Sequence, residues 1–255
     1  MLFTTDTVIV VTGSSRGLGL GFVKHFLEYT DSKVIATARS LSKAESLHTL
    51  LTQYPKRLQT VTLDTSEESS IEACVKEISA LHSGIDLLIN NAGIEDGVGP
   101  IWETTGATYS NVLRVNVVGV FLTTKAFVPL LRKKRSRTIV QLSSIFGSTS
   151  FNRKGTESHP AANKLIAYNS SKAAVNMQTS VFANALSEED FCIIAIHPGW
   201  NETEMGGTLA RKLGMEHAPL KPQESAAKMV NVMKNLTPKN SGEFLDLEKG
   251  DKIDY

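Results

Sequence analysis

The sequence predicts an α/β domain: a parallel sheet of about seven strands with helices on both faces. Three observations support this. Short β-branched runs alternate with helical patterns from end to end of the 255 residues. The runs are apolar at almost every position, as in strands buried on both faces. No linker, repeat or low-complexity segment divides the chain. We therefore expect one domain over residues 1–255.

The order of the elements follows from these runs and from the spacing of apolar residues. The expected strands are Thr7–Thr12, Lys33–Ala38, Leu58–Leu63, Ile85–Ile89, Thr138–Leu142, Phe191–His197 and Gly242–Leu247. The expected helices are one containing Phe22–Leu27, then Leu41–Tyr54, Ser66–His82, Glu103–Leu113, Leu113–Leu131, Leu165–Leu186 and Gln223–Leu236. Ser66 is expected to cap its helix. Phe151–Asn163 is expected to be a loop, and Glu202–Gly214 has the small residues of a mobile lid.

Composition excludes several classes of protein. The chain is 41% apolar and 21% charged, with a formal net charge of +1, which gives no argument for a nucleic-acid partner. Two cysteines and scattered histidines indicate neither a disulfide framework nor a metal site. The N-terminus lacks the pattern of a signal peptide, and no apolar run approaches the roughly 20 residues of a membrane span. We expect a cytoplasmic protein.

A glycine-rich turn follows the first strand. Its residues are Gly13, Ser14, Ser15, Arg16, Gly17, Leu18 and Gly19, and a helical pattern begins at once after them. Free N–H groups and the dipole at a helix N-terminus favour a phosphate, and glycines allow its close approach. The layout predicts a Rossmann-type, doubly wound domain that binds a dinucleotide.

The end of the second strand indicates which dinucleotide. An acidic residue about 20 positions beyond the glycines would bind the ribose 2′-hydroxyl of NAD, but Ala38 and Arg39 stand here. A guanidinium can hold a 2′-phosphate with several donors, and Arg16 could reach the same group. The sequence therefore favours NADP(H).

A phenol and an ammonium stand four residues apart in the helical segment Leu165–Leu186, at Tyr168 and Lys172. This spacing puts both on one helix face. A nearby cation lowers the pKa of a tyrosine, so the pair suits general acid–base chemistry. The carboxyl ends of parallel strands share one edge of the sheet. That edge also receives Asp64, Asn90–Gly93, Ser143–Ser144 and Pro198–Thr203.

Taken together, these motifs resemble those of the classical short-chain dehydrogenases/reductases. The motifs are Thr12-Gly13-x-x-x-Gly17-x-Gly19, Asn90-Asn91-Ala92-Gly93, Asn116, Ser144, Tyr168-x-x-x-Lys172 and Pro198-Gly199-x-x-x-Thr203, in order over nearly the whole chain. His197-Pro198-Gly199-Trp200, Met205-Gly206-Gly207 and Gly242–Asp246 also resemble the C-factor/sniffer group of carbonyl reductases.

The resemblance implies a role for each matching residue. Tyr168 would donate a proton to the substrate oxygen, Lys172 would lower the tyrosine pKa and bind the nicotinamide ribose, and Ser144 would polarise the carbonyl. Asn116 would hold a water that links Lys172 to solvent. Asp64 would contact the adenine, Asn91 the ribose region and Thr203 the carboxamide. The remaining cofactor-binding residues would be Gly13, Ser15, Arg16, Gly17, Leu18, Gly19, Arg39, Thr65, Ala92, Gly93, Pro198 and Gly199.

Two departures from the family pattern bear on the substrate. The stretch Phe151–Asn163 looks like an insertion beside the pocket, and Asn201 stands where many relatives carry an apolar residue. The pocket would be formed by Glu95–Thr105, Phe151–Asn163 and Glu202–Gly214, and their pattern does not identify the substrate.

The resemblance implies an NADPH-dependent reductase of an aldehyde or ketone, or the reverse alcohol dehydrogenase, with a small-molecule substrate and no membrane partner. The alternative is an NADP(H)-binding signalling or scaffold protein with little catalysis. Relatives commonly pair through the helices that contain Asn116 and Tyr168, so the resemblance also implies a homodimer or homotetramer.

Overall fold

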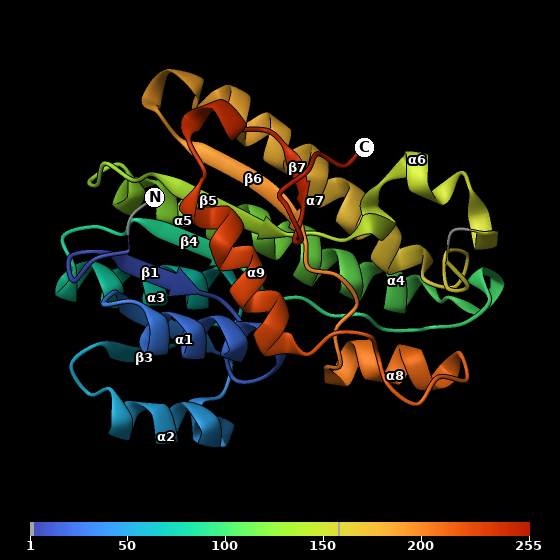
Figure 1. Cartoon of the computed structure of the whole chain (residues 1–255), viewed down its shortest axis with the longest axis horizontal. Coiled ribbons are helices and arrows are strands. Elements are labelled where there is room, and N and C mark those ends of the chain that lie inside the picture. Colours follow the sequence, from blue (N-terminus) through green and yellow to red (C-terminus); the bar gives the residue numbers. More distant parts are fainter. Residues whose placement is uncertain (1–2, 158) are drawn as a thin grey trace.

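A single seven-stranded sheet forms the centre of the computed structural model, which describes residues 3–157 and 159–255 (Figure 1). Every strand pairing is parallel, and the strand order is β3-β2-β1-β4-β5-β6-β7. The strands are β1 Val8–Val11, β2 Lys33–Ala38, β3 Leu58–Thr62, β4 Leu87–Asn90, β5 Thr138–Leu142, β6 Cys192–His197 and β7 Phe244–Asp246. The expected fold class is confirmed.

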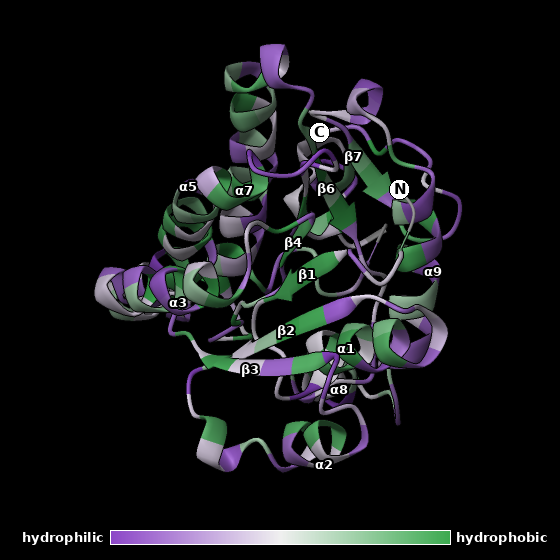
Figure 2. Cartoon of the chain, turned by 90° about the vertical axis from the view of Figure 1, so that its left-hand side faces the viewer, coloured by the Kyte–Doolittle hydropathy of each residue, from purple (hydrophilic) through white to green (hydrophobic). Residues whose placement is uncertain are grey.

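Helices cover both faces of this sheet (Figure 2). The helices α3, α5 and α7 pack on one face and α1, α2 and α9 on the other, each over its own apolar core. Strands β1, β4 and β5 are buried at every position because both faces are covered. The longer helices are α1 Gly17–Tyr29, α2 Glu45–Gln53, α3 Glu68–Leu81, α4 Gly106–Leu113, α5 Val120–Leu131, α7 Ile166–Ala185, α8 Glu204–Lys212 and α9 Pro222–Lys234.

The strand order changes direction between β1 and β4. The chain builds β1, β2 and β3 outward to one side, then returns to place β4 on the other side of β1. The connections at the carboxyl ends of these two strands therefore diverge, and a crevice opens between them. The glycine turn after β1 and the segment Asn91–Gly93 after β4 lie at this point, where a doubly wound sheet binds its ligand.

Two details of the expected helices are wrong. The helix expected at Leu41–Tyr54 is interrupted at Ala44, which separates a short 3₁₀ turn, Leu41–Lys43, from α2. Ser66 does not cap α3, whose N-cap residue is Glu67. The Ser66 hydroxyl instead donates to the Asp64 carboxylate at 2.7 Å, and its amide does so at 2.9 Å. The carboxylate at the end of β3 takes both donors of Ser66.

The segments expected as separate helices at Glu103–Leu113 and Leu113–Leu131 form one helix, Gly106–Leu131, with a π-helical stretch at Arg114–Gly119. Among the described residues it is the one helix long and apolar enough, by length and composition, to span a membrane. We expected none. In this fold it packs against α3 and α7, with Phe127 and Leu131 fully buried, as a core helix does.

The two expected irregular segments are partly helical. The insertion Phe151–Asn163 begins inside α6, Thr149–Asn152, and continues through a 3₁₀ turn at Gly155–Glu157; Ser158 lies outside the described residues. The expected lid contains α8. Both excursions lie at the right-hand end in Figure 1, beyond the carboxyl ends of the strands. They pack together in a third apolar cluster that includes Phe146, Leu209 and Trp200.

Candidate active site

The glycine turn has the backbone that a phosphate site needs. Gly13 and Gly17 have φ of +66° and +57°, a region that favours glycine. A Cβ at Gly13 would lie 2.9 Å from the Cα of Ala92, so the turn is pressed against the end of β4. The N-cap residue of α1 is Arg16, and no side chain caps the first turn. The first amides of α1 are therefore available to an anion.

Asn91 holds this turn in place. Its Nδ2 donates to the carbonyls of Thr12 and Gly13 at 2.8 and 3.0 Å. In return, the Thr12 hydroxyl accepts hydrogen bonds from the amides of Asn91 and Ala92. The sequence implied a ribose contact for Asn91; in the structure its amide nitrogen fastens the ends of β1 and β4 to each other. Thr12, which the resemblance named only as part of a motif, forms the other hydrogen bonds of this link through its hydroxyl.

The groups expected around the adenosine half lie at the same edge. Arg39 is exposed directly after β2. Arg16 forms an exposed ion pair with Glu204 of α8, 3.0 Å from Nε to Oε2. Burial raises the pKa of the Asp64 carboxyl, but the hydrogen bonds from Ser66 and the charges of Arg39 and Arg114 outweigh burial and hold it below its ordinary value. Asp64 is therefore an anionic acceptor.

Tyr168, Lys172 and Ser144 converge at the carboxyl end of β5. Lys172 is buried, and its Nζ donates to the carbonyl of Leu142 at 2.7 Å. The same nitrogen lies 5.5 Å from the centre of the Tyr168 ring. The Ser144 hydroxyl is within hydrogen-bonding range of the phenol. The structure thus brings together the three side chains that the sequence proposed as catalytic.

The electrostatics of this trio differ from the expectation. Burial raises the pKa of the Tyr168 phenol to about 12; the Ser144 hydrogen bond opposes the increase and the charge of Glu95 adds to it. Burial also lowers the pKa of Lys172 to about 8. The expected lowering of the tyrosine pKa by Lys172 is not seen here, because the ammonium bonds the Leu142 carbonyl and lies beside the ring.

The structure distinguishes between the two adjacent serines. The Ser143 hydroxyl is buried between β5 and α7 and donates to Oδ1 of the buried Asn176 at 2.6 Å. Ser144 is the N-cap residue of the following 3₁₀ turn, and its Oγ accepts from the amide of Phe146 at 3.2 Å. Ser144 is therefore the serine available to a substrate.

Asn116 lies in the π-helical stretch and is fully buried. Its Oδ1 accepts from the Ile94 amide, and its Nδ2 donates to the Ile94 carbonyl and to the Ser171 hydroxyl, at 2.8, 2.8 and 3.0 Å. These contacts join the segment after β4 to α7 next to Lys172. A π-helical insertion often marks a functional site. The water relay implied for Asn116 stays a prediction.

The segment after β6 completes the edge. Gly199 has φ of +68°. Thr203 is the N-cap of α8, accepts from the Gly206 amide at 3.0 Å, and its methyl faces Gly17 of the glycine turn. Asn201 is buried; its Nδ2 donates to the Pro198 carbonyl at 2.6 Å, and its Oδ1 accepts no hydrogen bond from the described residues.

Two further residues contribute to the site, although the sequence assigned neither of them a role. His197 ends β6, and its Nδ1 accepts from the Ile145 amide, next to Ser144, at 3.2 Å. Burial lowers the pKa of His197 to about 4, so this ring nitrogen stays an acceptor at neutral pH. Glu95 follows the Asn-Asn-Ala-Gly motif and acts electrostatically on Tyr168. The sequence signals for His197 were its place at a strand end and at the start of the motif His197-Pro198-Gly199-Trp200. The signal for Glu95 was its place at the start of the expected pocket segment Glu95–Thr105.

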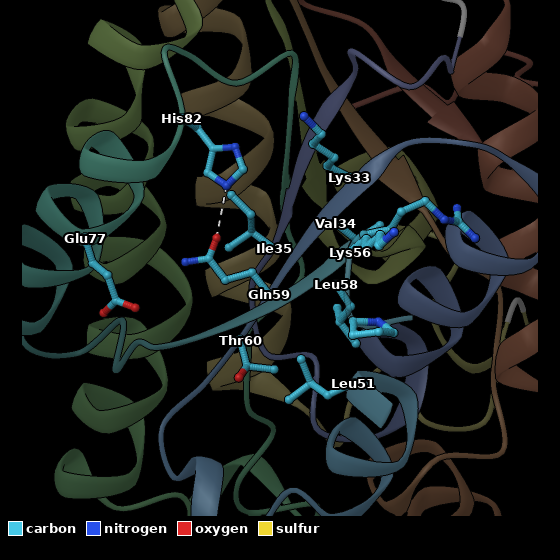
Figure 3. Close-up of a pocket in the computed structure, with 12 residues that line it drawn as sticks. Lys33, Val34, Ile35, Leu51, Lys56, Leu58, Gln59, Thr60, Glu77 and His82 are labelled. Atoms are coloured by element: carbon cyan, nitrogen blue, oxygen red, sulfur yellow. Dashed lines mark hydrogen bonds between the residues drawn. The ribbon is translucent and has the colours of Figure 1, made fainter. Parts of the chain in front are cut away.

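A separate groove lies away from the carboxyl edge of the sheet. Figure 3 shows a groove of about 460 Å³ between β2, β3 and the residues after α3, where His82 hydrogen-bonds Gln59 at 3.0 Å. It contains Lys33 and Arg57 but none of the converging side chains at the carboxyl edge. The Arg57 guanidinium already donates to the Thr30 carbonyl at the end of α1. We attribute the groove to the open edge of the sheet.

Comparison with known proteins agrees with this geometry. The family model described as short chain dehydrogenase matches residues 7–214. An uncharacterized oxidoreductase of Schizosaccharomyces pombe is 31% identical over 94% of this chain and 95% of its own. The NADPH-bound carbonyl reductase from chicken fatty liver has a TM-score of 0.88 at 32% identity, covering 100% of this chain and 96% of its own. The carbonyl reductase Sniffer of D. melanogaster has a TM-score of 0.86 at 27% identity, covering 98% and 99%.

A doubly wound sheet with a glycine turn and a Ser, Tyr and Lys trio defines a dinucleotide-dependent oxidoreductase of the dehydrogenase class. This chain belongs to the short-chain dehydrogenase family. Its structural neighbours include carbonyl reductases.

Proposed function

We propose that this protein is an NADPH-dependent reductase of aldehydes or ketones, which can also run as an alcohol dehydrogenase. The observation that carries the proposal is the convergence of Tyr168, Lys172 and Ser144 at the sheet edge that also holds the glycine turn. The similarity to an NADPH-bound carbonyl reductase supports the same reading.

The residues present fit an NADP(H) cofactor. The positive φ values of Gly13 and Gly17 and the uncapped first turn of α1 provide a cradle for the pyrophosphate. Arg39 and Arg16 provide guanidinium groups for a 2′-phosphate, and no carboxylate stands at the end of β2 to repel it. Thr203, whose methyl group faces Gly17, would lie beside the bound cofactor. NADPH, when bound, supplies the hydride.

The chain's own side chains handle the proton. The Ser144 hydroxyl would donate to the substrate carbonyl oxygen and fix its direction. The Tyr168 phenol, whose raised pKa of about 12 keeps it protonated at neutral pH, would give its proton to that oxygen as charge develops there. Lys172, whose Nζ lies 5.5 Å from the centre of the Tyr168 ring, would bind the nicotinamide ribose and so hold the cofactor beside the phenol.

An NADP(H)-binding scaffold or signalling protein is the competing proposal. It would predict loss of one of the three side chains or a break in their geometry, and neither is present. The burial of Lys172 also argues against it, since a buried ammonium is costly to keep without a use.

The test follows NADPH absorbance with a panel of aliphatic and aromatic aldehydes, ketones and diketones. We expect oxidation of NADPH with at least one carbonyl class, and weaker activity with NADH. Tight NADPH binding in calorimetry without turnover of any carbonyl or, in reverse with NADP, any alcohol would favour the scaffold.

A further inference from the structure

Glu95 places a carboxylate beside the candidate active site without a hydrogen-bond donor for one of its oxygens. The side chain is half-buried. Its Oε1 is fully buried and accepts no hydrogen bond from the residues that the structure describes. A buried acceptor without a donor is unfavourable, so such an atom in a site calls for an explanation.

The backbone that carries Glu95 is fixed next to the catalytic trio. A Cβ at Gly93 would lie 3.2 Å from Oδ1 of Asn116 and 3.8 Å from Nζ of Lys172. Ile94 is hydrogen-bonded to Asn116 through both its amide and its carbonyl. Glu95 is the next residue, so its position relative to Lys172 is set by a rigid contact rather than by a loose loop.

The surroundings of Glu95 belong to the substrate side of the site. Val98, three residues on, packs in the apolar cluster that contains Tyr168, Trp200 and Leu213. Trp200 and the insertion meet there through His159, whose ring lies 4.9 Å from the Trp200 ring, centre to centre. The cluster thus joins α8, the insertion and the segment after β4 around the phenol. Glu95 is the acidic side chain of this enclosure that acts on Tyr168.

Lys212 of α8 is the cation whose charge acts on the Glu95 carboxyl, but it does not form an ion pair with Glu95. Burial raises the pKa of the Glu95 carboxyl, while the charge of Lys212 lowers it and that of Asp96 raises it. No ion pair joins Glu95 to Lys212 within the described ranges, and the Lys212 ammonium lies 3.5 Å from the Val98 carbonyl, to which it donates. Oε1 therefore lacks a donor among the described residues, and the half-buried side chain lets the Glu95 carboxylate meet a donor on another molecule.

We propose that Glu95 determines substrate specificity: its carboxylate accepts a hydrogen bond from a donor group on the substrate, a protonated amine or a hydroxyl, while the substrate carbonyl lies at Tyr168 and Ser144. This inference rests on the proposed function. It assigns the substrate class as carbonyl compounds that carry a donor a few bonds from the carbonyl, because Glu95 follows directly on Gly93 and Ile94, which lie against Lys172 and Asn116. A substrate that is wholly apolar leaves Oε1 without a partner.

The test compares three aldehydes of similar shape: meta-dimethylaminomethylbenzaldehyde, meta-hydroxymethylbenzaldehyde and meta-isobutylbenzaldehyde. The kcat/KM of each is measured with NADPH for the wild type, Glu95→Gln and Lys212→Met. Glu95→Gln keeps the shape and removes the charge. Lys212→Met removes the positive charge that acts on Glu95. It is the matched control because it also removes the contact of α8 with the Val98 carbonyl but leaves the Glu95 carboxylate in place.

We expect the wild type to prefer the amine or the hydroxyl substrate over the isobutyl one by about 10-fold or more. Glu95→Gln should remove most of a preference for the amine while changing the isobutyl substrate less than threefold or so. Lys212→Met should increase the preference for the amine substrate or leave it unchanged. If the Glu95→Gln variant lowers all three substrates equally, or if the wild type shows no preference for a donor, the proposal is wrong.

Failure of the proposed function gives a different result. In that case none of the three aldehydes is reduced by the wild type, and the carbonyl panel above is inactive as well. Turnover of the isobutyl aldehyde with no donor preference would overturn the role of Glu95 alone. Thermal unfolding of Glu95→Gln shows whether a loss of activity reflects misfolding.

Discussion

At the scale of single residues, Ser143 and Ser144 are adjacent but do different things. Ser143 holds Asn176 of α7, and Ser144 faces the Tyr168 phenol. The sequence favoured Ser144 from family likeness alone. The side-chain contacts give the physical reason, because a serine that already donates to a buried amide oxygen has no hydrogen to offer a substrate.

This difference predicts opposite phenotypes for two alanine variants. Ser144→Ala should lower kcat by roughly 10²-fold or more with little loss of stability, because it removes a donor to the developing oxyanion. Ser143→Ala should keep turnover within a few-fold and lower the free energy of unfolding by about 1–3 kcal/mol, because Asn176 loses its donor in a buried place. Steady-state kinetics and urea unfolding measure both; the reverse pattern would mean that the serine roles are exchanged.

His197 predicts a pH dependence of stability. Burial lowers its pKa from the ordinary 6.5 to about 4; the His159 charge acts in the same direction and Asp246 opposes it. The unfolded chain therefore binds a proton between these two values that the folded chain does not. The stability contribution is complete above pH 6.5, falls as the pH falls and is lost below about pH 4, by about 3 kcal/mol at most.

The variant His197→Asn isolates this contribution, since an asparagine oxygen can still accept from the Ile145 amide but does not titrate. Urea unfolding at a series of pH values should show a smaller loss of stability for the variant than for the wild type between pH 6.5 and 4. Parallel curves for the two proteins would contradict the assigned pKa.

At the scale of elements, the end of β2 and the glycine turn together select the cofactor. Arg39 follows β2 directly and is exposed. We expect Arg39→Asp to lower kcat/KM for NADPH by roughly 10- to 100-fold and to raise it for NADH, because the carboxylate repels a 2′-phosphate and can accept from a 2′-hydroxyl.

Lys43→Asp is the matched control. It makes the same change of charge on an exposed residue of the neighbouring 3₁₀ turn. If Lys43→Asp alters the NADPH to NADH ratio as much as Arg39→Asp does, the effect is one of general charge and Arg39 does not read the phosphate.

An element could be predicted when the local sequence pattern determines it, and could not when contacts with distant residues determine it. The strands were predictable because apolar β-branched runs record burial on both faces. The π-helical stretch was not predictable, because its Asn116 is hydrogen-bonded to Ile94 and Ser171, which are distant in sequence. The segment that forms α8 was expected to be a mobile lid, because it is polar and contains the small residues Gly206 and Gly207. The Thr203 cap and the Trp200 indole, which donates to the Gly206 carbonyl, support it.

The site shows the same division. The motif residues lie at one edge as the topology required. Glu95 and His197 act through contacts that only the folded chain creates. The pKa values of Tyr168, Lys172 and His197 are shifted mainly by burial, which also exists only in the folded chain. Sequence spacing can place Tyr168 and Lys172 on one helix face, but it cannot show that the ammonium is bonded to Leu142.

At the scale of the whole molecule, helices α5 and α7 and the π-helical stretch that precedes α5 leave an apolar face exposed. Val118, Phe121, Met177 and Val181 are 48%, 41%, 65% and 56% exposed. Large exposed apolar groups that gather on neighbouring helices mark an interaction surface. We propose that two copies of the chain pair through this face, as the family resemblance led us to expect.

The double variant Met177→Glu, Val181→Glu should shift the protein from dimer to monomer in sedimentation velocity, because four buried carboxylates would face one another across a two-fold interface. Leu81→Glu, an exposed apolar residue at the end of α3, should have no effect. A wild type that sediments as a monomer at micromolar concentration would exclude this interface.

The proposed reaction depends above all on the phenol of Tyr168 as the proton donor. Single-turnover reduction of a carbonyl by prebound NADPH in Tyr168→Phe tests this most directly, with the dissociation constant of NADPH measured alongside. We predict unchanged NADPH binding and a rate at least about 10²-fold slower than the wild type. A variant that binds NADPH and reduces the carbonyl at the wild-type rate would show that the Tyr168 phenol is not the proton donor.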